Sequence, residues 1–120
     1  MTPLRILIAD DHPLFRKGMR TLLVSMPETE VVGEATTGKE TVDRALALQP
    51  DIVLMDYHLD QTSGLDAVEW LRHNVGGHLP AALVTADRTA AVRALAEDRG
   101  IAVVTKPVKP AALRAAISGL

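Results

Sequence analysis

The sequence predicts an α/β protein in which a doubly wound, five-stranded parallel sheet carries helices on both faces. Short apolar runs alternate five times with longer stretches whose apolar residues recur about every 3.6 positions. Three of the runs are nearly continuous in Val, Ile and Leu, which is typical of strands buried on both faces. Five strand–helix units favour right-handed crossovers and a single domain over residues 1–120.

The apolar runs place the strands, and the stretches with helical period place the helices between them. The expected strands are Leu4–Ala9, Glu30–Ala35, Ile52–Met55, Ala81–Thr85 and Ile101–Thr105. The second is the most polar, which indicates a sheet edge. The expected helices carry apolar stripes made of Phe15, Met19 and Leu22; Val42, Ala45 and Leu46; Leu65, Val68 and Leu71; Val92, Leu95 and Ala96; and Leu113, Ile117 and Leu120.

Proline and glycine positions agree with these helices. Pro13 and Pro110 suit first helical turns, and Gly100 suits the position after a helix end.

Composition argues against several functional classes. Lys and Arg number 13 against 15 Asp and Glu, a net charge of -2 that offers no general attraction to nucleic acid or to an anionic membrane. The absence of cysteine excludes disulfides, thiol nucleophiles and thiolate zinc sites. Residues 1–11 contain a short apolar run that two acids interrupt, which is typical of neither a signal peptide nor a membrane span. We therefore expect a cytoplasmic protein.

Polar side chains stand at the carboxyl ends of four expected strands, the edge where ligands bind in doubly wound sheets. They are Asp10, Asp11, Asp56, Thr85 and Lys106. Adjacent carboxylates repel one another and need a cation, and an oxygen-only ligand set suits Mg²⁺. Lys106 supplies a charge for a phosphoryl group, and Thr85 supplies a hydroxyl donor. A carboxylate beside a metal can act as a nucleophile toward phosphorus, and Asp56 is the best placed to do so.

This ordered set resembles the receiver domain of bacterial two-component response regulators over essentially the whole chain. The resemblance implies a flavodoxin-like fold with strand order 2-1-3-4-5. It implies that Asp56 takes a phosphoryl group from a sensor histidine kinase or a phosphotransfer protein. It also implies that Asp11, Asp56 and the backbone carbonyl of His58 ligate Mg²⁺ directly. Asp10 would act mainly through water.

The same resemblance implies that Thr85 and Lys106 contact the phosphoryl oxygens, with Ala86 leaving room for them. Gly64 and a cis Lys106–Pro107 bond match further family positions. The domain would act as a phosphoacceptor and switch that catalyses its own phosphorylation and dephosphorylation, rather than as a separate enzyme. Its partners would be the kinase and an output domain or protein outside this chain, with homodimerisation through the fourth helix, fifth strand and fifth helix.

The identity of the output stays open at this point. Residues 1–23 resemble the start of regulators with a C-terminal helix-turn-helix, whereas residues 83–88 and 104–115 resemble receivers at the end of hybrid sensor kinases.

Two positions depart from the receiver pattern. Asp60 stands where many receivers have proline, and Val103 stands where Phe or Tyr is common. We expect phosphorylation still to draw Thr85 inward but to have an altered or weaker readout on the last elements of the fold.

The histidines near the acids have two interpretations. For His12 and His58, simple solvation is favoured over recruitment of a transition metal. His58 and Asp87 are also expected to flank the path of attacking water and to affect the lifetime of the phosphorylated state.

Two other functional classes remain as alternatives. A phosphatase of the haloacid dehalogenase type would use the same nucleophile, but it wants an acid two residues later, where His58 stands. A receiver-like interaction module without phosphorylation is favoured by Val103 and disfavoured by the complete acidic set. Formation of an acyl phosphate separates this interaction module from a working receiver, whereas turnover of a generic phosphate ester would favour the phosphatase.

Overall fold

The computed structural model describes residues 3–59, 62–63, 69, 71–74, 79–86 and 90–118. In chain order its elements are β1 (Leu4–Ala9), α1 (Pro13–Val24), β2 (Thr29–Ala35), α2 (Gly38–Leu48), β3 (Ile52–Asp56), β4 (His58–Leu59), β5 (Thr62–Ser63), β6 (Ala81–Thr85), α4 (Ala90–Asp98), β7 (Ala102–Thr105) and α5 (Pro110–Ser118). All five expected strands are present, each within one residue of its expected bounds.

The third expected helix is described only in part. Residues 69 and 71–74 are helical, whereas Leu65 and Val68 of its predicted stripe lie outside the described residues. Asp60, Gly64 and Asp87 lie outside them as well.

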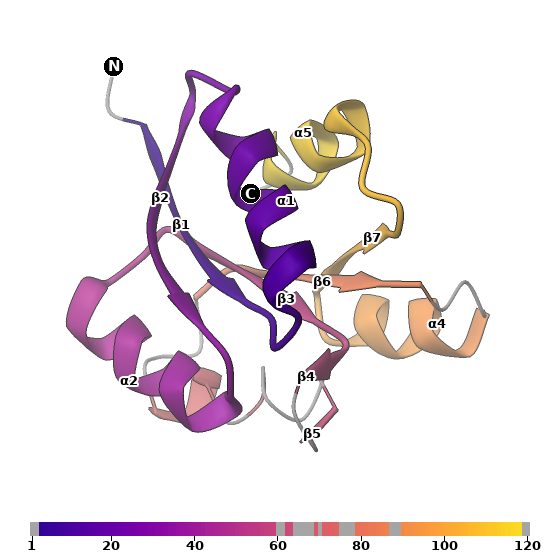
Figure 1. The fold of residues 1–120 in the computed structure, drawn as a ribbon. Coiled ribbons are helices and arrows are strands. Elements are labelled where there is room, and N and C mark those ends of the chain that lie inside the picture. The colour runs from indigo at the N-terminus through magenta and orange to yellow at the C-terminus, as the bar shows by residue number, and fades with distance from the viewer. Residues whose placement is uncertain are drawn as a thin grey trace.

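The main sheet has five parallel strands in the order β2-β1-β3-β6-β7 (Figure 1). This confirms the expected order 2-1-3-4-5, with β6 and β7 as its fourth and fifth strands, and it confirms that the polar β2 forms an edge. The short strands β4 and β5 pair with each other in an antiparallel ladder that the sequence did not predict.

A one-residue irregularity interrupts the pairing of β1 with β2. Ile6 pairs with Val31 and Leu7 pairs with Gly33, so Val32 is an extra residue on the edge strand. Such a bulge locally bends the strand that carries it. Beyond the bulge the pairing continues with the register shifted by one residue, and Ala9 pairs with Ala35 at the end where the candidate site begins.

Helices cover both faces of the sheet, α1 and α5 on one and α2 and α4 on the other (Figure 1). Each layer encloses its own buried apolar cluster. The first consists of Ile6, Ile8, Met19, Leu23, Met26, Ile52, Leu54, Ala82, Leu113 and Ile117. The second consists of Leu7, Ala9, Ala35, Val42, Ala45, Val53, Met55, Leu59, Leu71, Ala81, Leu83, Ala96 and Ile101. Alternation of side chains along β1 and β3 sends neighbouring residues to opposite layers.

Two leucines of the predicted stripes are not in the core. Leu46 of α2 and Leu95 of α4 are 51% and 45% exposed. In α2 the buried face is centred on Ala45 and includes Thr41, and Leu46 lies about 100° further round the helix. The spacing of the apolar residues thus misjudged the centre of the buried face in α2 and α4, whereas in α5 the predicted Leu113 and Ile117 are buried.

Within the described ranges, no helix is both long and apolar enough to cross a membrane.

Candidate functional site

Four neighbouring strands bring the expected polar residues together at one edge of the sheet. Asp10 follows β1, Asp56 ends β3, Thr85 ends β6 and Lys106 follows β7. Asp10, Asp56 and Thr85 are almost fully buried, at 2%, 4% and 2% exposure. Parallel pairing therefore explains why charged residues can follow the most apolar segments of the chain: they end in a shared site.

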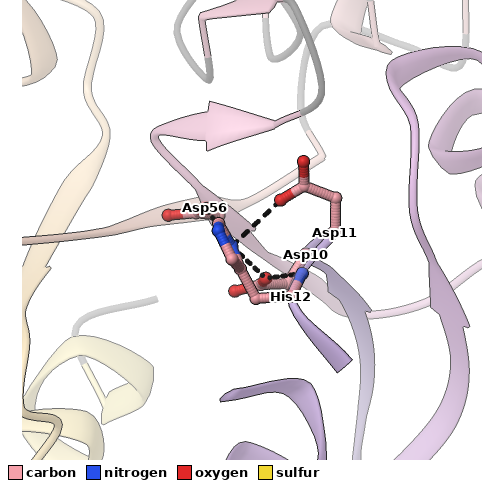
Figure 2. Close-up of side chains that lie close together, drawn as sticks. All are labelled: Asp10, Asp11, His12 and Asp56. Carbon is pink, nitrogen blue, oxygen red and sulfur yellow. Dashed lines mark hydrogen bonds and ion pairs between the residues drawn. The ribbon is translucent and has the colours of Figure 1, made fainter. Parts of the chain in front are cut away.

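Three carboxylates and one imidazole meet at this edge (Figure 2). Asp10, Asp11, His12 and Asp56 each contribute one potential ligand atom, and these atoms all lie within 4.8 Å of one another. The acids come from two adjacent strands, which pair Ala9 with Met55 and so place the following residues side by side.

Lys106 is the cation that faces Asp56 across the site. Its Nζ lies 3.3 Å from Asp56 Oδ1 and 4.0 Å from the centroid of the Phe15 ring. Its backbone N–H donates to the carbonyl oxygen of Thr85 at 2.8 Å, which ties the end of β7 to the end of β6. The bond to Pro107 is cis, as the resemblance implied.

Backbone contacts fix Asp10 from several directions. Its N–H donates to the carbonyl oxygen of Ala35 at 2.9 Å. Its own carbonyl oxygen accepts from Arg16 at 2.8 Å, and its Oδ1 accepts from the His12 N–H at 2.7 Å. Arg16 is held in turn by Glu34, whose Oε1 lies 3.0 Å from the arginine Nε. These bonds link β1, β2 and α1 around one acidic residue.

Burial raises the pKa of Asp10 above its usual range. The negative charge of Asp56 adds to this effect, while the hydrogen bond from the His12 backbone and the positive charge of Lys106 oppose it. Folding thus holds this carboxyl at an energetic cost that a bound cation would relieve.

The donor set fits a divalent metal ion. Asp10 Oδ2 and Asp56 Oδ2 are buried and accept no hydrogen bond from any described residue. A buried, unsatisfied carboxylate oxygen is costly unless a cation or donor meets it. Oxygen ligands of this kind are those that Mg²⁺ prefers.

Sequence reasoning did not single out Arg16, the lysine contact of Phe15 or the contacts of His12 with the acids. His12 is exposed, as expected of a solvated histidine, and its Nδ1 lies 3.0 Å from Asp11 Oδ1, 3.3 Å from Asp10 Oδ1 and 3.6 Å from Asp56 Oδ2. Its ring is 63% exposed, so one edge faces solvent while Nδ1 faces the acids. Position next to the acid pair was the only signal in the sequence.

The structure describes no side-chain contact within the site for three other residues named in the sequence analysis. The backbone of His58 begins β4, two residues after Asp56, and its side chain is outside the description. Val103 of β7, which stands where receivers commonly have Phe or Tyr, is partly buried and packs against the second cluster. Ala86, after Thr85, is exposed.

Residues 6–118 match the family model described as the response regulator receiver domain. The chain belongs to this family. Members are signalling domains of two-component systems, which agrees with the acidic pocket at the strand ends.

The curated relatives that share this region are proteins of two different kinds. The nitrate/nitrite response regulator protein NarP of Escherichia coli strain K12 is 44% identical over 73 residues, which are 61% of this chain and 34% of that protein. A protein-glutamate methylesterase/protein-glutamine glutaminase of Carboxydothermus hydrogenoformans is 41% identical over 71 residues, 59% of this chain and 20% of that protein. The matched region is thus about a third or less of these relatives.

Solved structures match almost the whole chain. A LuxR-family two-component response regulator from Aurantimonas sp. superposes with a TM-score of 0.90 at 33% identity, covering 98% of this chain and 84% of that one. The signal receiver domain of the putative response regulator NarL from Mycobacterium tuberculosis gives 0.86 at 26% identity, covering 99% and 97%.

Proposed function

We propose that Asp56 accepts a phosphoryl group from the phosphohistidine of a sensor histidine kinase or a phosphotransfer protein, in a reaction that depends on Mg²⁺. The observation that carries this proposal is the position of Asp56 between a cation and two acids. Lys106 lies 3.3 Å from one of its oxygens, while the other is buried and accepts no hydrogen bond from the described residues.

The transfer exchanges one bond for another. A carboxylate oxygen of Asp56 bonds to phosphorus while the bond between phosphorus and the donor's imidazole nitrogen breaks, and the electron pair of that bond stays on the nitrogen. The product is an acyl phosphate. Lys106 and the Thr85 hydroxyl then stabilise the charge on the phosphoryl oxygens.

The metal would be held by Asp11, Asp56 and the backbone carbonyl of His58, with Asp10 acting mainly through water. Mg²⁺ in such a site neutralises charge on the carboxylates and on the incoming phosphoryl group. The acids hold the ion, and burial of Asp10 and Asp56 keeps water from screening their charge.

Phosphorylation would act as a switch for a partner. Thr85 sits at the end of β6, beside β7 and the neighbouring α4 and α5, so its movement toward a phosphoryl group can alter the surface of these elements. We propose that residues 1–120 form one such receiver, that the altered surface controls an output domain or protein outside this chain, and that it can support a homodimer.

The decisive experiment is intact-mass analysis after incubation with acetyl phosphate and Mg²⁺. We expect one added phosphoryl group in the wild type, none in Asp56→Asn and none in EDTA. Asp43→Asn, which changes an exposed acid on α2, is the matched control and should be phosphorylated like the wild type.

An adduct that survives Asp56→Asn would contradict the assignment of the phosphoacceptor. Absence of any adduct, from acetyl phosphate and from phosphorylated kinase or phosphotransfer protein alike, would favour an interaction module without phosphorylation. Continuous release of phosphate from simple phosphate esters would instead revive the phosphatase alternative.

A further inference from the structure

We propose that His12 is a metal ligand, so that Asp10, Asp11, Asp56 and the Nδ1 of His12 form a mixed carboxylate–imidazole site for a divalent transition-metal ion such as Co²⁺ or Zn²⁺. The inference rests on the proposed function, because it assigns a second class of cation to the site proposed there for Mg²⁺. It concerns which ions this receiver accepts.

The spacing of the four groups matches the spacing of ligands around one ion. For metal–ligand bonds of about 2.1 Å, neighbouring ligands are about 3.0 Å apart in an octahedron and about 3.4 Å apart in a tetrahedron. The His12 Nδ1 lies 3.0, 3.3 and 3.6 Å from oxygens of Asp11, Asp10 and Asp56 (Figure 2). The separations between the nitrogen and the carboxylate oxygens are therefore close to those of neighbouring ligands on one ion.

The backbone of His12 is restrained from both sides. His12 is the N-cap of α1, yet its side chain makes no capping hydrogen bond. Its N–H donates to Asp10 Oδ1 at 2.7 Å, and Pro13 follows at the first helical position. Proline fixes its own φ and restricts the residue before it to extended conformations. These restraints fix the backbone of His12, and in the protein without metal the nitrogen already lies beside the acids.

Two buried carboxylate oxygens of the cluster have no hydrogen-bond donor among the described residues. Asp10 Oδ2 and Asp56 Oδ2 accept no hydrogen bond from the described residues although their side chains are 2% and 4% exposed. The contact of His12 with the acids does not satisfy them. A cation that meets Asp56 Oδ2, which lies 3.6 Å from the His12 Nδ1, would bring the imidazole into its coordination shell.

Imidazole distinguishes between the two classes of ion. Mg²⁺ favours oxygen and keeps several waters, whereas imidazole suits Co²⁺ and Zn²⁺. All-carboxylate sites already bind transition metals more tightly than Mg²⁺. Ligation by His12 must therefore be detected as a change in the ratio of Co²⁺ or Zn²⁺ affinity to Mg²⁺ affinity. Loss of the ring should weaken the binding of Co²⁺ and Zn²⁺ and leave that of Mg²⁺ nearly unchanged.

Calorimetric titration of the wild type, His12→Ala and His73→Ala with CoCl₂, ZnCl₂ and MgCl₂ tests this inference. His73 is an exposed histidine on the helical residues 71–74 and serves as the matched control. We expect His12→Ala to weaken Co²⁺ and Zn²⁺ binding by about tenfold or more while Mg²⁺ affinity changes by no more than about twofold. His73→Ala should bind like the wild type.

The visible absorption of bound Co²⁺ gives a second readout, because loss of a nitrogen donor shifts its ligand-field bands. An unchanged spectrum and unchanged Co²⁺ affinity in His12→Ala would overturn the proposal. Equal weakening of all three ions would also overturn it, since His12 would then act only through general electrostatics or folding.

The proposed phosphorylation is tested separately on the same variants. In Mg²⁺ and acetyl phosphate, the wild type and His73→Ala should gain a phosphoryl group on Asp56. If no variant gains one, the proposed function fails, whereas the titrations and the Co²⁺ spectra still report on His12.

Discussion

The ammonium nitrogen of Lys106 lies 4.0 Å from the centroid of the Phe15 ring. This contact joins the loop after β7 to the first turns of α1, which are distant in sequence. The same nitrogen lies 3.3 Å from Asp56 Oδ1, so the ring and the carboxylate hold the ammonium group between them. Phe15 is thus a positioning residue for the lysine.

Replacing Phe15 by Leu should slow phosphorylation. The change removes a cation–π attraction of about 0.5–2 kcal/mol while it keeps an apolar side chain of similar size. We expect the rate of adduct formation from acetyl phosphate to fall by about two- to tenfold. Phe15→Tyr, which keeps the ring, should react like the wild type, and so should Leu14→Ala, at a neighbouring residue that is 83% exposed. Equal rates in Phe15→Leu and the wild type would show that the ring does not position Lys106.

Neutralising Asp10 should stabilise the metal-free protein. Because burial holds its pKa above the ordinary value, the folded state binds a proton more tightly than the unfolded chain. The ionised carboxyl therefore destabilises the fold at neutral pH, and stability returns as the pH falls through the raised pKa. We expect Asp10→Asn to unfold at higher denaturant in EDTA at pH 7, by about 0.5–2 kcal/mol.

The pH and metal dependence of that variant check the cause. The advantage of Asp10→Asn over the wild type should shrink as the pH falls through the raised pKa of Asp10. Saturating Mg²⁺ should stabilise the wild type more than the variant, because only the wild type keeps all the acids. An advantage that is independent of pH would point to a cause other than ionisation.

Two glycines should respond to alanine with opposite signs. Gly100 has φ +65, and a Cβ there would meet no atom within 4 Å, so Gly100→Ala should destabilise through backbone strain alone, by about 1 kcal/mol. Gly18 lies inside α1 and also has open space around it, so Gly18→Ala should stabilise by about 0.8–1 kcal/mol. Chemical denaturation of both variants measures the difference, and a shared sign would refute the conformational explanation.

Phosphorylation should move Thr85 even though Val103 replaces the usual aromatic residue. Val103 packs against the apolar cluster beneath β6 and β7, and it offers no ring to follow the threonine. We expect the Thr85 methyl signal in NMR to shift with acetyl phosphate and Mg²⁺ in the wild type but not in Asp56→Asn. Val103→Tyr should enlarge the accompanying changes in α4 and α5. A Thr85 signal that stays fixed in phosphorylated protein would disprove the first expectation.

The sequence predicted the parts of the fold in which the type of side chain is dictated by the secondary structure and its burial. Buried parallel strands need apolar residues on both faces, so continuous apolar runs predicted β3 and β6. The carboxyl ends of such strands meet, so the sequence alone predicted that Asp10, Asp56 and Lys106 lie together, as they do.

The sequence could not predict features that depend on the orientation of a side chain or on the packing of one element against another. The ring of His12 turns its Nδ1 toward the acids, and this orientation of a side chain is not encoded in any sequence pattern. Arg16 reaches the carbonyl oxygen of Asp10 only because α1 packs against β1 and β2. The β4–β5 ladder pairs two residues on each strand, which is too short for a hydrophobic period to reveal.

The extra residue at Val32 indicates where this architecture tolerates a change in chain length. On the outer strand a single additional residue is absorbed by one local bend, and the pairing beyond it, from Leu7 with Gly33 to Ala9 with Ala35, is intact. The same insertion in β3, which is paired on both sides, would exchange the faces of every later side chain and would carry Asp56 away from Lys106. Insertions and deletions during descent should therefore collect on the β2 edge and spare the central strands.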